Sequence, residues 1–150
     1  LTDAEPPPEL PPTFVACPGR TSLPLLEAEL TITEVAVEDD QVERLRRQHN
    51  PYEEWLDLER VQPPLFVRGR REGDRFHPLG APGAKSLSDF FKDEKLDPLQ
   101  RARTGVLCDQ SGPIWIMPLR IDERVKLRAT TTRALRLVLR PLVPHHAVQP

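Results

Sequence analysis

Basic side chains are concentrated in the second half of this sequence, beside glycines and prolines and apart from any nucleophile–base pair. A guanidinium group holds a phosphate through two parallel hydrogen bonds, and an ammonium group attracts it as a point charge. The chemistry available to such residues is therefore the binding of a polyanion. The candidate binding residues are Arg68, Arg70, Arg71, Arg75, Lys85, Lys92, Arg101, Arg103, Arg124 and Lys126. For each of them taken singly, the alternative is a solvated surface position or a structural ion pair.

The near-neutral net charge of −2 conceals an uneven distribution. Residues 1–60 carry 14 acidic and 5 basic residues, whereas residues 61–150 carry 9 acidic and 16 basic residues. A basic C-terminal part within an otherwise neutral chain is the pattern of a polyanion-binding face. Ordinary surface charge is the alternative.

The sequence offers no recognisable catalytic or metal-binding group. Cys17 and Cys108 lack the spacing of a zinc or redox motif, and His145-His146 has no cysteine or carboxylate near it. Two isolated thiols fit a cytoplasmic protein. An apolar run of membrane-spanning length and a signal peptide are both absent from the sequence.

One alternative hypothesis is an enzyme whose site uses Asp74, His77 and Asp122. The adjacent pair Asp122-Glu123 is a weak candidate for acid–base chemistry, because neighbours in sequence point in different directions. Asp74 is more simply interpreted as a turn residue, and His77 as a loop residue.

Composition favours short strands and turns, since 18 of the 150 residues are proline. Alternating or continuous apolar residues predict strands at residues 13–17, 30–37, 52–58, 65–70, 106–109, 113–117 and 134–139. The apolar alternation shifts by one residue at Glu34, which predicts a β-bulge there. A helix is predicted at residues 41–48, capped by Asp39-Asp40. The continuous apolar run at residues 114–117 predicts a strand covered on both faces.

The segment between the central strands predicts a turn and two capped helices. Gly73 can adopt a positive φ in the turn, and Asp74 can stabilise it. Residues 86–89 (Ser-Leu-Ser-Asp) form a capping-box pattern ending at Asp89, followed by Phe90 and Phe91, which we expect in the core. Residues 97–100 (Asp-Pro-Leu-Gln) form a second cap, with Leu99 and Ala102 facing inward and Gly105 ending the helix in a left-handed conformation.

The domain organisation follows from these patterns. We expect residues 1–12 to be a proline-rich arm or linker, residues 13–140 to be one domain, and residues 141–150 to be a tail. Because the sequence begins with Leu, we interpret it as a piece of a longer protein.

Residues 65–140 contain a series of spaced motifs that resembles the C-terminal domain of the tRNA(Ile)-lysidine synthetases. The motifs are R-x-R-R-x-G-D-R-F at Arg68–Phe76, G-x-x-G-x-K-x-L-x-D-F-F at Gly80–Phe91, a second cap and helix at Asp93–Arg101, an apolar hairpin at Val106–Met117, R-I-D-E-R-x-K at Arg120–Lys126 and a final strand at Thr132–Leu139. A composite of this length is far more specific than a single glycine pattern.

The resemblance implies an α+β, mostly β fold: an unusual β-sandwich with a few short helices, similar to a module of the phenylalanyl-tRNA synthetase β subunit. It implies that the ten basic residues bind the acceptor stem of tRNA(Ile). It also implies a parent enzyme that uses ATP and Mg²⁺ to attach lysine to the wobble cytidine. The catalytic S-G-G-x-D-S loop of that enzyme belongs to an N-terminal domain, and this sequence contains no such motif.

By the same resemblance, this part of the protein has no catalytic residue, metal or cofactor of its own. Its partners are the tRNA acceptor stem and the N-terminal catalytic domain, with a second copy of the chain as a further candidate and no membrane. The competing hypothesis is a structural domain that docks on the parent enzyme or a partner and makes little direct contact with RNA.

Overall fold

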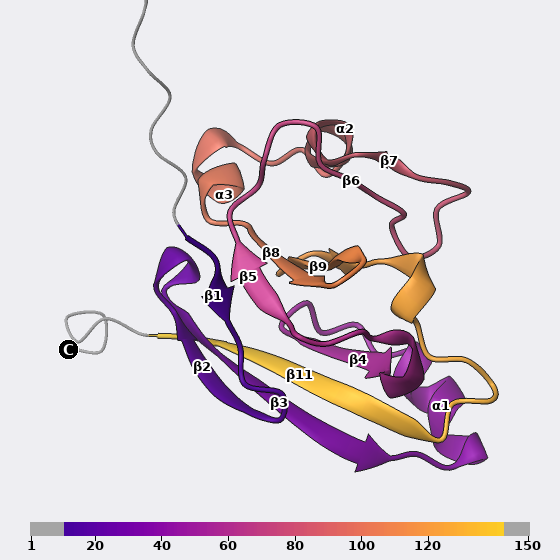
Figure 1. Cartoon of the computed structure of the whole chain (residues 1–150). Coiled ribbons are helices and arrows are strands. Elements are labelled where there is room, and N and C mark those ends of the chain that lie inside the picture. The colour runs from indigo at the N-terminus through magenta and orange to yellow at the C-terminus, as the bar shows by residue number, and fades with distance from the viewer. Residues whose placement is uncertain (1–10, 143–150) are drawn as a thin grey trace, which may run out of the picture.

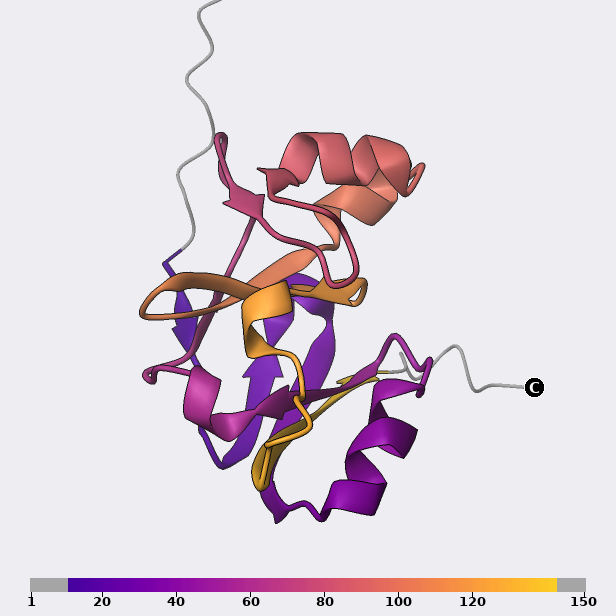
Figure 2. The same cartoon turned by 90° about the vertical axis from the view of Figure 1, so that its right-hand side faces the viewer.

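Two β-sheets pack face to face in the computed structural model, which describes residues 11–142 (Figures 1 and 2). The first sheet has the order β1-β5-β8-β9-β10, with strands Thr13–Phe14, Phe66–Arg68, Gly105–Asp109, Gly112–Met117 and Arg120–Ile121. The second has the order β2-β3-β11-β4, with strands Gly19–Leu23, Ala28–Ala36, Arg133–Pro141 and Glu53–Asp57. Neighbouring strands in both sheets are antiparallel.

Short helices complete the fold. The α-helices are α1 (Asp39–Arg46), α2 (Leu87–Asp93) and α3 (Pro98–Ala102), and the 3-10 turns are η1 (Pro24–Leu26), η2 (Leu58–Arg60) and η3 (Glu123–Val125). A two-stranded hairpin, β6 (Arg75–Phe76) with β7 (Lys85–Ser86), precedes α2. The predicted fold class, a mostly β sandwich with a few short helices, is confirmed. None of the helices in the described part is long and apolar enough to cross a membrane.

The main core lies between the two sheets. Leu135, Leu137 and Leu139 alternate along β11 and are at most 3% exposed, as the alternation in the sequence predicts. Trp115 and Met117 of β9 face this core, whereas Ile116 faces a second cluster formed with α2. The prediction that this strand is covered on both faces is therefore confirmed.

The predicted bulge at Glu34 is wrong. β3 pairs without interruption with β11 from Ala28 to Ala36. The apolar pattern changes phase because Leu30 and Ile32 face the main core, while Val37 packs in a third cluster with α1. The register irregularity in the described sheets lies instead at Leu107/Cys108 of β8.

Two helix predictions also need correction. α1 is capped by Glu38, which forms a capping box with Gln41, so Asp39 and Asp40 lie inside the first turn. α3 ends at Ala102, and Gly105 opens β8 without a positive φ. A Cβ at Gly105 would stand 2.8 Å from Leu26 Cδ1, so a larger residue at this position would displace the Leu26 side chain of η1.

The final strand ends close to the C-terminal limit of the described residues. β11 continues to Pro141, and Leu142 N–H donates to Glu27 O at 2.8 Å. Most of the predicted proline-rich arm (residues 1–10) and of the predicted tail (residues 143–150) lies outside the described residues, as do His145 and His146.

Candidate nucleic-acid interface

The turn after β5 is held by an ion pair between two predicted residues. Arg68 donates to both carboxylate oxygens of Asp74, at 3.0 and 2.9 Å, and the two side chains are only 9% and 10% exposed. Asp74 Oδ2 also accepts from Arg71 N–H at 2.6 Å, and Gly73 has a φ of 86°. The guanidinium of Arg68 is therefore occupied in fixing the turn, and we leave Arg68 out of the interface.

The turn leads to a clip made of β6, β7 and α2, which packs on the face of the first sheet that points away from the second sheet (Figure 1). Ser86 Oγ accepts from Asp89 N–H at 3.0 Å, which caps α2. Phe90 and Phe91 are 1% and 0% exposed, so the expectation that they belong to the core is confirmed. Phe76 meets Phe90 edge to face at 5.0 Å between ring centroids.

Three arginines from different elements lie over these two phenylalanine rings. The Cζ atoms of Arg70 and Arg101 stand 5.6 and 6.0 Å from the Phe91 centroid, and that of Arg120 stands 5.4 Å from the Phe90 centroid. A ring face attracts a cation and also orders a long side chain. The arrangement therefore holds three guanidinium groups on a rigid apolar base.

Arg120 is the residue of this group that sequence reasoning missed. It belongs to the quoted R-I-D-E-R-x-K segment, but it lies seventeen positions beyond the previous candidate, Arg103, and follows an apolar strand. The available signal was its place directly after the hairpin, which brings it back toward α2. It also donates to Glu94 Oε2 at 3.3 Å.

The two later candidates, Arg124 and Lys126, are both paired. Arg124 binds both carboxylate oxygens of Asp109, at 3.1 and 2.6 Å, and joins η3 to the β8–β9 hairpin. Burial would raise the pKa of Asp109, but hydrogen bonds from Arg124 and from the N–H groups of Gln62 and Ser111 lower it below the ordinary value. The ammonium group of Lys126 pairs with Glu123.

The remaining candidates lie on the clip and α3. Lys85 is half-buried and pairs with Asp93. Arg101 is half-buried, and its Nε–H donates to Leu96 O at 3.2 Å. The exposed candidates of this surface are Arg70, Arg71, Arg75, Lys92 and Arg103. The structure thus gathers these candidates around α2 and α3, while Arg124 belongs to the hairpin joint.

The alternative enzyme site does not form a common centre. Asp74 is engaged by Arg68, while Asp122 accepts from His77 N–H at 3.0 Å and Arg124 N–H at 2.9 Å. The Nε2 atom of His77 lies 2.6 Å from Ala81 O, so its ring fixes its own loop. Within residues 11–142, no three His, Cys, Asp or Glu residues are grouped to hold a metal ion, and Cys17 and Cys108 are free thiols.

The family model and the similar proteins agree on one family for the second half of the chain. Residues 65–138 match the family model described as TilS substrate C-terminal domain. Curated tRNA(Ile)-lysidine synthases are similar in the same region: that of Dehalococcoides mccartyi is 40% identical over 88 residues, and that of Symbiobacterium thermophilum is 34% identical over 126 residues. These matches cover 59% and 84% of this chain but 19% and 25% of the relatives. The chain thus spans about a fifth to a quarter of their length.

Two solved structures share the fold. A crystal structure of a TilS C-terminal domain superposes with a TM-score of 0.69 at 23% identity, covering 87% of this chain and 95% of that one. An N-terminal fragment of the phenylalanyl-tRNA synthetase β subunit from Pyrococcus horikoshii gives a TM-score of 0.57 at 14% identity, covering 73% and 38%. At such identities, the likeness concerns the architecture.

Proposed function

Residues 65–138 of this chain belong to the TilS substrate C-terminal domain family, and from this membership we propose that the chain binds the acceptor stem of tRNA(Ile) and positions the tRNA for a parent tRNA(Ile)-lysidine synthase. The parent enzyme would attach lysine to the wobble cytidine with ATP and Mg²⁺. That chemistry would belong to an N-terminal domain, because this sequence has no S-G-G-x-D-S motif. A cytoplasmic location is part of the same proposal.

The observation that carries this proposal is the group of three arginines over Phe90 and Phe91. Duplex RNA presents two phosphate ridges and a shallow minor groove lined by 2′-hydroxyl groups, and proteins recognise mainly this shape. A protein that recognises the shape of duplex RNA needs cations at fixed positions on rigid elements. Arg70, Arg101 and Arg120 meet this need, and exposed Arg75 and Lys92 extend the same surface.

The test is a mobility-shift titration of the 150-residue chain with an acceptor-stem minihelix at several salt concentrations. The double variant R70A/R120A removes two guanidinium groups, so the slope of log affinity against log salt should fall by about 2. The matched control is Arg140→Ala, an exposed arginine on β11 of the other sheet, which should leave the slope unchanged. Circular dichroism melting of each variant checks that the fold is kept.

The docking hypothesis remains the second candidate, because apolar side chains are also exposed. Phe14 is 63% exposed beside Phe66, with ring centroids 5.8 Å apart, and Leu99 of α3 is 61% exposed, contrary to its predicted inward position. Such residues are suited to an interface with another domain. If the minihelix is not shifted at low salt, or if the shift is insensitive to salt, the tRNA proposal fails and docking on the parent enzyme becomes the better explanation.

A further inference from the structure

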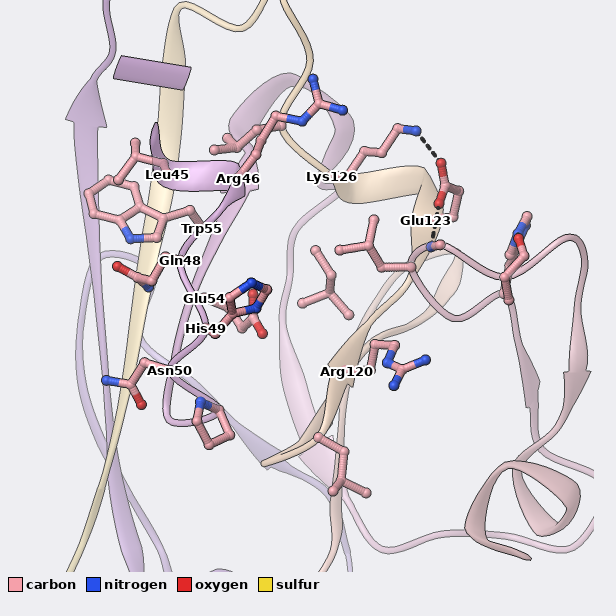
Figure 3. Close-up of a pocket in the computed structure, with 18 residues that line it drawn as sticks. Leu45, Arg46, Gln48, His49, Asn50, Glu54, Trp55, Arg120, Glu123 and Lys126 are labelled. Atoms are coloured by element: carbon pink, nitrogen blue, oxygen red, sulfur yellow. Dashed lines mark hydrogen bonds and ion pairs between the residues drawn. The ribbon is translucent and has the colours of Figure 1, made fainter. Parts of the chain in front are cut away.

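A groove of about 800 Å³ runs along one side of the sandwich, where the edge strands β4 and β10 leave the two sheets open (Figure 3). One wall is formed by the end of α1 and by β4, and the other by the loop of residues 77–81 and the segment of residues 119–127. Leu79, Leu119 and Leu127 contribute apolar side chains to its lining. Phe90 and Phe91, the base of the arginine surface, do not line this groove.

Glu54 stands in this groove as a carboxyl group without a partner. It lies on the face of β4 that carries buried Leu56, opposite Leu137 of β11. No described residue donates a hydrogen bond to its carboxylate or forms an ion pair with it. Burial, and then the charge of Glu53, raise the pKa of Glu54 to about 7. A carboxylate that is shielded from water and accepts no hydrogen bond lowers the stability of the fold. A ligand that donates N–H groups to Glu54 would therefore be bound favourably.

The charged residues around Glu54 set the second requirement. Arg46, Arg120 and Lys126 line the groove, against one further acid, Glu123, which pairs with Lys126. Arg46 has only a 3.8 Å contact with exposed Glu43, so its guanidinium is available. The groove therefore combines an excess of positive charge with one unsatisfied hydrogen-bond acceptor.

We propose that this groove holds an unpaired segment of single-stranded RNA: the base of one nucleotide donates its amino group to Glu54, the phosphate of that nucleotide lies against Arg120, and the phosphate of its neighbour lies against Arg46 at the other end of the groove (Figure 3). A carboxylate accepts from the N4 amino group of cytosine, whereas uracil places a carbonyl oxygen at the same position and is repelled. RNA-binding proteins commonly read unpaired bases by such edge contacts together with stacking. His49, which is exposed at the groove, offers a flat ring for stacking.

The inference rests on the proposed tRNA function, because Arg120 belongs to both surfaces. Its guanidinium covers Phe90 of the clip and also borders the groove. A duplex bound on the arginine surface would therefore lie beside the groove, and a single-stranded extension of that duplex could enter it. The ligand would thus be a duplex end with an unpaired strand.

The experiment compares three RNA duplexes with the same stem: a blunt one, one with a 3′ overhang of cytidines and one with a 3′ overhang of uridines. We expect the cytidine overhang to strengthen binding by about fivefold to tenfold, in line with one charge-assisted hydrogen bond. The uridine overhang should add little. Glu54→Leu removes the acceptor next to existing apolar side chains and should abolish the gain, whereas Glu59→Gln, an exposed acid on η2, should preserve it.

The outcomes separate the two proposals. Equal gains from both overhangs, or no gain from either, with the blunt duplex still bound, would overturn the groove assignment and leave the tRNA proposal standing. If the blunt duplex is not bound, the tRNA proposal fails, and an NMR titration with cytidine and uridine trinucleotides decides on the groove alone. Shifts of the His49 and Trp55 resonances by the cytidine trinucleotide only support the groove assignment, and the absence of such shifts overturns it.

Discussion

Arginine has two different roles in this domain, and its neighbours determine which. Arg68 and Arg124 each make two hydrogen bonds to one carboxylate, and those carboxylates, of Asp74 and Asp109, are 10% and 0% exposed. Arg70 instead lies over an aromatic ring and is exposed. The sequence does not distinguish these roles, because Asp109 precedes Arg124 by fifteen positions and only the fold brings the two together.

The Asp109–Arg124 pair gives a prediction about stability. Asp109→Asn leaves Arg124 with a neutral partner, so we expect a loss of about 3 kcal/mol, near the lower end of the range for buried pairs because Arg124 is a third exposed. The folded-state pKa of Asp109 is lowered, so its contribution is present above the ordinary pKa of 3.8 and is lost as pH falls through the folded value. Urea unfolding near pH 7 and below pH 4 measures both effects, and Asp40→Asn on exposed α1 is the control.

The contribution of Glu54 to stability depends on pH in the opposite direction. Its pKa is raised from 4.5 to about 7 in the folded chain, so its stabilising contribution is complete below about pH 4.5 and is lost as pH rises through about 7. Glu54→Gln removes this titration and should make the chain more stable than the wild type at pH 8, with a smaller difference at pH 5. Denaturant unfolding at the two pH values is the measurement. Equal differences at both would show that the carboxyl group is not shielded in solution.

At the scale of elements, the clip depends on helix caps that are visible in the sequence. Ser86 Oγ accepts from Asp89 N–H, and Asp97 and Gln100 form a complete capping box on α3. Ser86→Ala should therefore cost about 1 kcal/mol of unfolding free energy. Ser88→Ala, an exposed position inside the same helix, is the matched control and should be neutral or slightly stabilising. Equal losses in both variants would contradict the cap.

Elements with strong local patterns could be predicted, and those formed by pairing alone could not. Leu135, Leu137 and Leu139 alternate, and the last strand was located correctly. β2, Gly19–Leu23, has almost no apolar alternation and exists because its backbone pairs with β3, so no pattern in its residues predicts a strand. The same limit applies to the site: Arg70 and Arg101 are candidates from the sequence, but Arg120 and the grouping of all three over Phe90 and Phe91 depend on segments far apart in the chain.

At the scale of the whole molecule, the distribution of charge matters more than its sum. The net charge is −2, which would disfavour a polyanion if the charge were uniform. The structure instead sets the clip and α3 on one side of the first sheet, and the second sheet, which carries Glu29, Glu34, Glu53 and Glu54, on its other side (Figure 2). The two layers keep most of the acidic residues of positions 1–60 away from the arginine surface.

This separation predicts strong salt dependence despite the negative net charge. If about four to six phosphates are contacted, log affinity for an RNA duplex should fall with log salt with a slope of roughly −3.6 to −5.4. A fourfold rise in salt would then weaken binding by roughly 10²-fold to 10³-fold. Filter binding across a salt series measures the slope, and a DNA duplex of the same sequence is the control. A surface that recognises duplex RNA depends on A-form geometry and 2′-hydroxyl groups. The DNA duplex should therefore bind more weakly at every salt concentration. Equal affinity for RNA and DNA would reduce the surface to a nonspecific polyanion site, and a slope near zero would contradict an electrostatic interface altogether.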